Sequence, residues 1–211
     1  ETGLQRYVTG RSRILCWLHN TAFDKNNAVF IRGARPDLDP VFATDVQAWA
    51  VSALGCTTLN SIQENLAFDL IKNIEHKALH TVEFIKPDGA NVRVSGVDYI
   101  DQLTASALGR PPMISPEWTF ELINAYARIE NDLTKKRSLD EAEYFKNKKQ
   151  NLLNQMLELT VETRAGAALP YATQYEARVG HGFKTPAKGN YSSIGIAYGI
   201  LAITGFDPLY R

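Results

Sequence analysis

The sequence has little cysteine, no surplus of charge of either sign and no long apolar run. Its two cysteines, Cys16 and Cys56, are too few for a disulfide framework and leave open one disulfide or two free thiols. Basic and acidic residues number 23 each, so no positive surplus is available for nucleic acid or anionic lipid. The longest apolar run, within Ile194–Ile203, is far shorter than the roughly 20 residues of a bilayer span. We therefore expect no nucleic-acid partner and no membrane span.

Metal-binding and cofactor motifs are also lacking. The four histidines form no HExxH motif, and the cysteines form no CxxC pair. His76 and His80 are four residues apart and could share a helix face, but no third ligand is evident nearby. We expect no metal and no cofactor.

The composition is typical of a globular protein, with 45% hydrophobic and 22% charged residues in 211 positions. This length predicts a single domain over residues 1–211. The chain opens Glu1-Thr2-Gly3, which is typical of a vector remnant or a cleavage product, so natural sequence could precede it. We therefore keep open that the domain is a fragment of a larger protein.

Apolar periodicity and capping residues predict a mainly α fold. Thr44 with Gln47, Ser61 with Glu64 and Ser138 with Glu141 have capping-box spacing. The predicted helices cover 44–55, 61–79, 138–163, 194–204 and a segment that starts at 116 after the cap Ser115. Residues 81–85 and 92–94 flank a Pro-Asp-Gly turn and predict one small β-hairpin, and 164–190 is expected to be a long ordered loop.

The order of these helices suggests repeated helical hairpins. Short apolar helices start near residues 45, 116 and 193, and longer amphipathic helices follow the first two. We expect the three short helices to pack side by side and parallel, with the longer ones outside. The 194–204 helix, apolar on nearly every side, should be enclosed by neighbours. An irregular helical bundle is the alternative.

Four stretches carry a resemblance to a known class: FATDVQAW at 42–49, ISPEWT at 114–119, LPYAT at 169–173 with GHGF at 180–183, and GFDPL at 205–209. Together they resemble the C-terminal half of bacterial glycoside-hydrolase-like proteins of the six-hairpin (α/α) toroid type. The resemblance implies a partial toroid with a carbohydrate site at its mouth, and a secreted or periplasmic location, with the cytoplasm left open. A full toroid needs roughly twice this length, so the missing N-terminal half of the same polypeptide is a candidate partner.

Asp45 and Glu117 are the candidate catalytic carboxylates. Each lies in the first turn of a predicted inner helix, and such helix starts converge at a toroid mouth. Two carboxylates there could act as general acid and base on a glycosidic bond. The alternative is that acidic residues only stabilise these helix N-termini.

The loop supplies the remaining candidates. His181 lies between two glycines and is a third catalytic candidate, because a His and a Tyr could act as base and acid in a β-elimination. We expect His181→Ala to weaken sugar binding with little change in melting temperature. Aromatic and basic side chains suit sugar stacking and uronate binding, and the substrate-binding candidates are Tyr171, Tyr175, Arg178, Lys184 and Tyr191. They could instead pack the loop onto the helices.

Four functions therefore stay open from the sequence. A glycoside hydrolase acting on a polysaccharide comes first, and a polysaccharide lyase is the second possibility. The third is a non-catalytic helical module that binds glycan or protein, and the fourth is a purely structural helical domain of a larger polypeptide.

Overall fold

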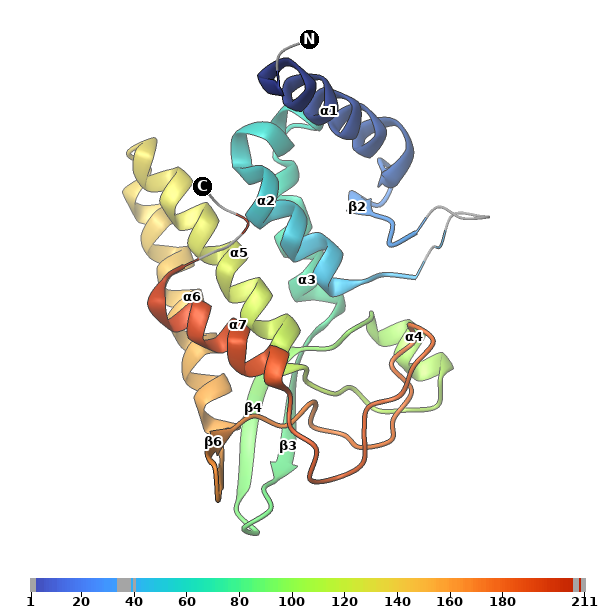
Figure 1. The fold of residues 1–211 in the computed structure, drawn as a ribbon, viewed down its shortest axis with the longest axis vertical. Helices are drawn as coiled ribbons and strands as arrows, with labels where there is room; N and C mark the ends of the chain where they lie inside the picture. The colour runs from blue at the N-terminus through green and yellow to red at the C-terminus, as the bar shows by residue number, and fades with distance from the viewer. Residues whose placement is uncertain (1–2, 34–38, 40, 207–208, 210–211) are drawn as a thin grey trace.

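The computed structural model of the chain describes residues 3–33, 39, 41–206 and 209, and it is mainly helical (Figure 1). The helices are α1 (Gly3–Trp17), α2 (Thr44–Ile62), α3 (Leu66–Lys77), α4 (Gln102–Ala107), α5 (Pro116–Lys135), α6 (Leu139–Glu158) and α7 (Ser193–Thr204), and a π-helical turn spans Leu18–Ala22. The antiparallel strand pairs are β1 (Phe23–Asp24) with β2 (Val29–Phe30), β3 (Leu79–Ile85) with β4 (Asn91–Val97), and β5 (Val161–Thr163) with β6 (Gly166–Ala168). The expected mainly α class and the predicted hairpin are confirmed.

Helix α5 is the centre of the fold, and it packs against α2, α6 and α7. Ser115 caps it by accepting a hydrogen bond from the Trp118 backbone N–H at 3.3 Å, and Pro116 occupies the first turn. Twelve of its 20 residues are buried. Helix α5 is therefore enclosed by its neighbours along most of its length.

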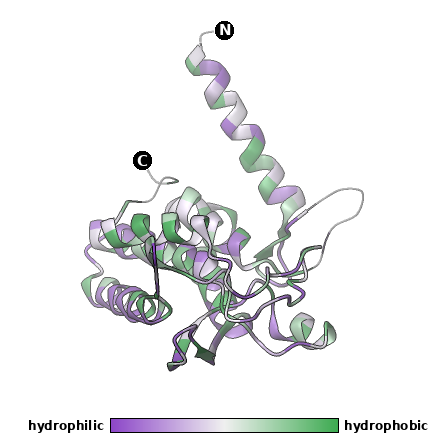
Figure 2. Ribbon diagram, turned by 60° about the horizontal axis from the view of Figure 1, so that its bottom comes forward, coloured by the Kyte–Doolittle hydropathy of each residue, from purple (hydrophilic) through white to green (hydrophobic). Residues whose placement is uncertain are grey.

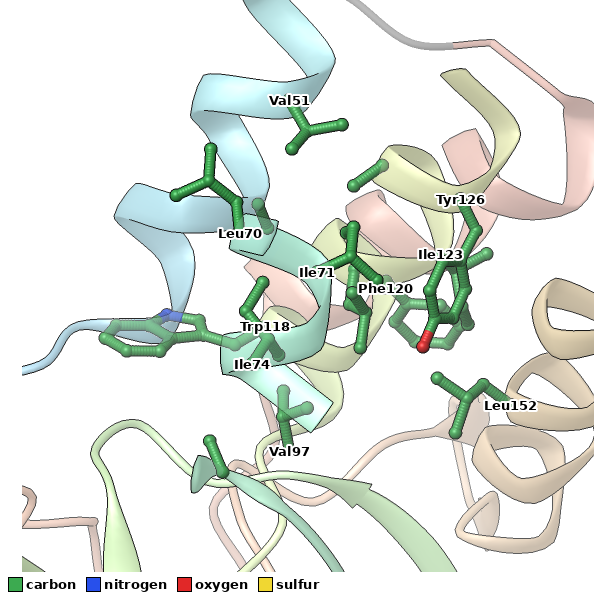
Figure 3. Close-up of a cluster of buried hydrophobic side chains, with 14 of the residues drawn as sticks. Val51, Leu70, Ile71, Ile74, Val97, Trp118, Phe120, Ile123, Tyr126 and Leu152 are labelled. Atoms are coloured by element: carbon green, nitrogen blue, oxygen red, sulfur yellow. The ribbon is translucent and has the colours of Figure 1, made fainter. Parts of the chain in front are cut away.

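The hydrophobic core lies where α2, α3, α5 and α6 meet above β4 (Figure 3). Each element presents an apolar stripe to this space, as amphipathic helices and half-buried strands do. The side chains that meet there include Val51, Leu70, Ile71, Ile74, Val97, Phe120, Ile123, Tyr126 and Leu152.

Several predicted boundaries are wrong because tertiary contacts override local signals. Helix α2 continues past Gly55, which forms a kink at φ 68°, and the Asp132 carboxylate accepts the hydrogen bond of the Cys56 N–H at 2.9 Å. Gln47 does not cap α2, because its amide bonds the backbone of Phe30 instead. No helix starts at Ser61: α3 begins at Leu66 after Asn65, and the helix predicted to reach residue 163 ends at Glu158.

The helix α1 was not predicted, and it projects from the rest of the chain (Figure 2). It has no buried residue among its 15, and Leu4, Tyr7, Val8 and Ile14 are all exposed. Helix α1 therefore contributes nothing to the described core.

The expected packing of the short helices is confirmed in part. Helix α5 lies between α2 and α7, and α6 is outside with its charged face in solvent. A Cβ on Gly195 would lie 3.6 Å from the Glu117 nitrogen and one on Gly199 3.1 Å from the Phe120 ring, so α7 approaches α5 through its glycines.

The prediction that α7 is enclosed on all sides is wrong. Its buried residues are Gly195 and Gly199, which face α5, whereas Ile194, Ile200 and Ile203 are more than half exposed. The described part of the chain supplies a neighbour on one side of this helix alone, so its other side remains in contact with solvent.

The structure bears on three smaller expectations, which concern the cysteines, the pair of His76 and His80, and a membrane span. Cys16 is exposed, Cys56 is buried, and both are free thiols. His80 lies in β3 and His76 in α3, so they share no helix face. Among the described helices, none combines the length and the apolarity that a membrane span requires.

Candidate functional site

The end of β4 holds the starts of α2 and α5 together. The Thr44 hydroxyl donates to the Asp98 carbonyl at 2.7 Å, and the Thr44 N–H donates to the Tyr99 carbonyl at 3.2 Å. The Ser115 N–H donates to the Val97 carbonyl at 2.9 Å. Because the two helix starts share this anchor, the predicted carboxylates of Asp45 and Glu117 are brought to the same end of the α2–α5 pair.

These two carboxylates interact electrostatically. Burial raises the pKa of the Glu117 carboxyl, and the charge of Asp45 raises it further. Burial also raises the pKa of Asp45, but the hydrogen bond from the Val46 N–H at 2.7 Å and the charge of Arg32 oppose the rise. Asp45 thus has groups that stabilise its ionised form, whereas Glu117 has a neighbour that favours its protonated form.

A third carboxyl, Glu121, was not predicted. It lies one helical turn after Glu117 on the same face of α5, just as Trp49 lies one turn after Asp45 on α2. Its side chain is 1% exposed, and the Trp49 side chain is a hydrogen-bond partner of its carboxyl. The four-residue spacing from Glu117 was the sequence signal that could have identified it.

Burial raises the pKa of Glu121 to about 9, with further contributions from the charges of Asp45 and Glu117. A hydrogen bond with the Trp49 side chain lowers the pKa of Glu121 and so opposes part of this rise. Near neutral pH the Glu121 carboxyl is therefore protonated. It lies one helical turn after Glu117 on α5.

Aromatic rings form one wall of this region. The ring of Tyr99 lies 4.7 Å from that of Trp118 in an edge-on arrangement, and it stacks on Tyr171 at 6.5 Å. Burial and the charge of Glu117 raise the pKa of the Tyr171 hydroxyl, so this predicted substrate-binding residue lies within electrostatic range of Glu117. Trp118 belongs to the core at 8% exposure, whereas Trp49 is 40% exposed.

His181 lies next to this wall, with its ring 5.3 Å from that of Trp118. Its Nε2 donates to the Tyr99 carbonyl at 3.1 Å, and its Nδ1 accepts a hydrogen bond from Arg32. Burial lowers the pKa of His181, and the Arg32 charge lowers it further. Because both ring nitrogens are engaged, this geometry favours a positioning role for His181 over that of a base.

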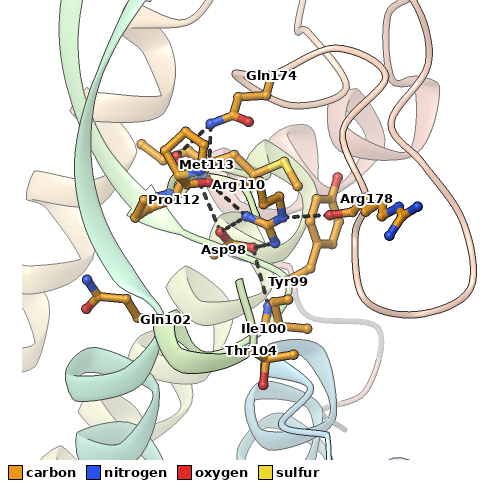
Figure 4. A network of polar contacts seen from close by, with 12 residues as sticks. Asp98, Tyr99, Ile100, Gln102, Thr104, Arg110, Pro112, Met113, Gln174 and Arg178 are labelled. Atoms are coloured by element: carbon orange, nitrogen blue, oxygen red, sulfur yellow. Dashed lines mark hydrogen bonds and ion pairs between the residues drawn. The ribbon is translucent and has the colours of Figure 1, made fainter. Parts of the chain in front are cut away.

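The other predicted loop residues make contacts with other parts of the chain. Tyr175 packs on Phe84 of β3 with the rings 6.5 Å apart. Burial raises the pKa of Tyr175 and the nearby Tyr191 hydroxyl raises it further, so these two tyrosines are neighbours. Arg178 and Lys184 face each other across a single bridge and are exposed. Figure 4 shows the Arg178 side chain directed away from the adjacent ion pair.

The loop lies over the starts of α2 and α5. The Thr173 N–H donates to the Ile114 carbonyl at 3.0 Å, and the Thr173 hydroxyl accepts from the Ile114 N–H at 2.9 Å. Tyr99 donates its hydroxyl to the Tyr171 carbonyl at 3.2 Å. These contacts, together with those of His181, join the loop to the segments that precede the two helices.

A buried ion pair between Asp98 and Arg110 lies next to the end of β4 (Figure 4). Both terminal nitrogens of Arg110 contact the Asp98 carboxylate at 2.7 Å, and the Arg110 Nε donates to the Arg178 carbonyl at 2.6 Å. Asp98 also accepts from the Met113 N–H at 3.0 Å. One buried pair therefore connects the end of β4, the segment before α5 and the loop.

Two cavities lie away from the carboxylates. One of about 830 Å³ is formed by the β1–β2 pair with the end of α3 and the start of α4. One of about 720 Å³ lies between α3 and α6. Neither is lined by Asp45, Glu117 or Glu121, so the concave site expected at these residues is not one of these cavities.

Comparison of the chain with protein-family models, with curated proteins and with solved structures gives no match. Within the described ranges, no group of three or more His, Cys, Asp or Glu side chains is arranged to hold a metal ion. The chemistry available at the site is therefore argued from its own residues: carboxyl groups whose proton affinities differ, beside aromatic rings.

Proposed function

We propose that the protein is a glycoside hydrolase whose acid and base are Glu117 and Asp45. The observation that carries this proposal is their placement in the first turns of adjacent helices, where the charge of Asp45 raises the pKa of Glu117. A pair of carboxyls of which one holds a proton and the other does not is what glycosidic cleavage requires.

The surroundings of the Glu117 and Asp45 carboxyls determine which one we propose as the acid and which as the base. Glu117 acts as the general acid, because burial and the neighbouring negative charge raise the pKa of its carboxyl. Asp45 acts as the ionised partner, because the Val46 N–H and the Arg32 charge stabilise its carboxylate. Tyr171, within electrostatic range of Glu117, is the candidate stacking surface for a sugar ring.

The polysaccharide lyase is the weaker alternative. It would use His181 as the base, but the two ring nitrogens already bond Arg32 and the Tyr99 carbonyl. The uronate contacts expected of Arg178 and Lys184 stay predictions, and both side chains are exposed.

We also propose that the helices form part of an (α/α) toroid. Its support is the alternation of central helices α2, α5 and α7 with α3 and α6, and the uncovered apolar side of α7. In a toroid the next hairpin would cover that side, so the missing N-terminal half of the polypeptide is the proposed covering element. A polysaccharide substrate would agree with a secreted or periplasmic location.

Release of reducing sugar from a panel of polysaccharides tests the proposal. We expect Glu117→Gln and Asp45→Asn to lower the rate at least 100-fold, since a positioned acid or base contributes about 10²–10⁴-fold. Glu158→Gln, the same change at an exposed position of α6, is the control. Undiminished release in Glu117→Gln would contradict the assignment, and sugar binding without release would favour a non-catalytic glycan-binding module.

A further inference from the structure

Helix α1 is amphipathic, and its apolar stripe is exposed. The stripe recurs at the spacing of one helix face, and its members are all more than half exposed: Leu4, Tyr7, Val8 and Ile14. The helix packs on the π-helical turn that follows it, and Figure 2 shows it standing away from the other helices. An exposed apolar stripe of this kind is typical of an element that packs against a partner.

The charge of α1 is of one sign. The helix contains three arginines, Arg6, Arg11 and Arg13, and no acidic residue. By helical spacing, Arg11 lies within the apolar stripe, between Tyr7 and Ile14, whereas the other two arginines lie on the opposite side. A partner of this face must therefore present apolar side chains and a carboxylate at the same place. The hydrocarbon of a lipid surface has no counter-charge for an arginine in that position.

The cavity of about 720 Å³ between α3 and α6, here called the acidic groove, offers this combination. The rings of Phe68 and Phe145 lie 5.8 Å apart in its lining. The Tyr144 ring lies 5.3 Å from that of Phe145, and Tyr144 is 54% exposed. Acidic residues in the lining outnumber lysines five to two, and they are Glu64, Asp69, Glu75, Asp140 and Glu141.

Three of these carboxylates have no basic partner. Lys148 binds Glu75 at 2.6 Å. In the part of the chain that the structure describes, no ion pair involves Glu64, Asp69 or Asp140. Five acidic residues less two lysines leave three negative charges in the groove, and α1 carries three positive ones. The two surfaces are therefore complementary in charge as well as in apolar character.

The α1 helix of the same chain begins on a different side of α3. The β1–β2 pair that follows α1 is held by Asn73, whose Nδ2 donates to the Ala28 carbonyl at 3.0 Å. Phe68, Lys72 and Glu75 line the groove from one face of α3. By helical spacing, Asn73 lies on another face. The groove of a second copy can be reached with the fold unchanged.

We propose that α1 of one copy docks in the acidic groove of a second copy. Arg11 binds a carboxylate of the groove, and the apolar stripe covers Tyr144 and the neighbouring rings. Because different surfaces of the two copies meet, the contact is heterologous and continues from copy to copy unless it closes into a ring. The inference is independent of the proposed hydrolase, since neither surface includes Asp45 or Glu117.

Sedimentation equilibrium of the intact chain tests the inference. We expect the mean mass to rise over about a hundredfold range of protein concentration, and the association to weaken about tenfold between about 0.1 and 0.5 M salt. Arg11→Glu should weaken it about tenfold or more, because like charges then face each other. Arg13→Glu makes the same change on the opposite side of α1 and should weaken it less than about threefold.

A mixing experiment identifies the partner as a second copy. The double variant Glu64→Lys and Asp140→Lys changes two exposed positions of the groove and should stay monomeric. This variant retains α1, whereas Arg11→Glu retains the groove. An equimolar mixture of the two proteins should therefore form a one-to-one complex and grow no further.

The other outcomes overturn the inference. They are a chain that stays monomeric at every concentration, equal weakening by Arg11→Glu and Arg13→Glu, and a mixture that forms no complex. Association that is unchanged in Arg11→Glu and lost in the double variant Ile200→Lys and Ile203→Lys would place the contact at α7 instead. Binding of α1 to phosphatidylserine–phosphatidylcholine vesicles without self-association would assign this helix to a lipid surface. Reducing-sugar release by Arg11→Glu should equal that of wild type, so failure of the hydrolase proposal leaves this inference standing.

Discussion

At the scale of single residues, burial changes what the carboxyl groups can do. Asp45, Glu117 and Glu121 have the same functional group, but they differ in solvent access and in their partners. Asp45 receives a backbone hydrogen bond, Glu117 does not, and Glu121 is enclosed. Their proton affinities differ for that reason, and the proposed roles follow from the difference.

Glu121 should make the stability of the protein depend on pH. Below its ordinary pKa of 4.5 it is protonated in both the folded and the unfolded states. Between 4.5 and about 9 the unfolded chain ionises while the folded chain does not, so stability falls as the pH rises. The slope from this one group approaches about 1.4 kcal/mol per pH unit.

Urea unfolding of wild type and Glu121→Gln at several pH values between about 5 and 8 measures this effect. We expect the free energy of unfolding of the variant to increase relative to that of the wild type with each unit of rising pH, because glutamine does not titrate. Glu158→Gln should follow the wild-type profile. Parallel curves for Glu121→Gln and wild type would show that Glu121 is ionised in the folded state.

His181 should be needed for stability, contrary to the expectation from its place between glycines. Its two hydrogen bonds hold the loop to Arg32 and to the Tyr99 carbonyl. We expect His181→Ala to lower the free energy of unfolding by about 1–3 kcal/mol, because the buried Tyr99 carbonyl and the partly buried Arg32 side chain each lose a hydrogen bond. Lys184→Ala in the same loop, at an exposed position, should leave the melting temperature unchanged. An unchanged melting temperature for His181→Ala would return this residue to the list of candidate ligand contacts.

At the scale of elements, the loop and the helix starts depend on the buried pair of Asp98 and Arg110. The carboxylate is 0% exposed, and the guanidinium spans the end of β4, the segment before α5 and the Arg178 carbonyl. Breaking such a pair leaves an uncompensated buried charge, which costs about 3–5 kcal/mol. The pair therefore decides whether these three segments stay together.

Asp98→Asn tests this dependence. We expect the free energy of unfolding to fall by about 3–5 kcal/mol, and proteolysis within the loop to become faster as its anchor is lost. Glu143→Gln is the matched control, because Glu143 pairs with Lys146 at an exposed position of α6 and its loss should leave stability unchanged. Equal effects of the two substitutions would exclude a special role for the buried pair.

At the scale of the whole molecule, apolar surface is left uncovered at both ends of the helical arrangement. Helix α1 exposes Leu4, Tyr7 and Ile14, and α7 exposes Ile200 and Ile203. Contiguous apolar surface of this kind marks a place where another element packs. The proposed toroid accounts for the side of α7, because another hairpin of the toroid would lie there.

Charged substitutions on α7 distinguish a covered from an uncovered face. We expect the double variant Ile200→Lys and Ile203→Lys to unfold within about 0.5 kcal/mol of wild type, because both side chains already contact solvent. It should also self-associate less in size-exclusion chromatography at high concentration. Ile196→Lys, on the side that packs against the core, should be clearly destabilising. A large loss of stability in the double variant would show that this face is packed within the chain.

The sequence by itself determined the elements whose signals are local. Ser115 and Pro116 define the start of α5, Ser192 caps α7, and the Pro-Asp-Gly turn defines the β3–β4 hairpin. It also placed Asp45 and Glu117 each in the first turn of a helix. These features depend on neighbours a few residues apart along the chain.

Tertiary structure decided the rest, because the deciding contacts join distant segments. The amide of Gln47 bonds Phe30 instead of capping α2, and α2 runs past Gly55 because Asp132 of α5 satisfies the Cys56 N–H. The apolar α7 is exposed because the described chain packs against one side of it. Glu121 holds its proton because α2 and α5 together exclude water and bring two other carboxylates near. No local pattern in the sequence shows which helix faces pack against each other. The burial of polar groups depends on that packing.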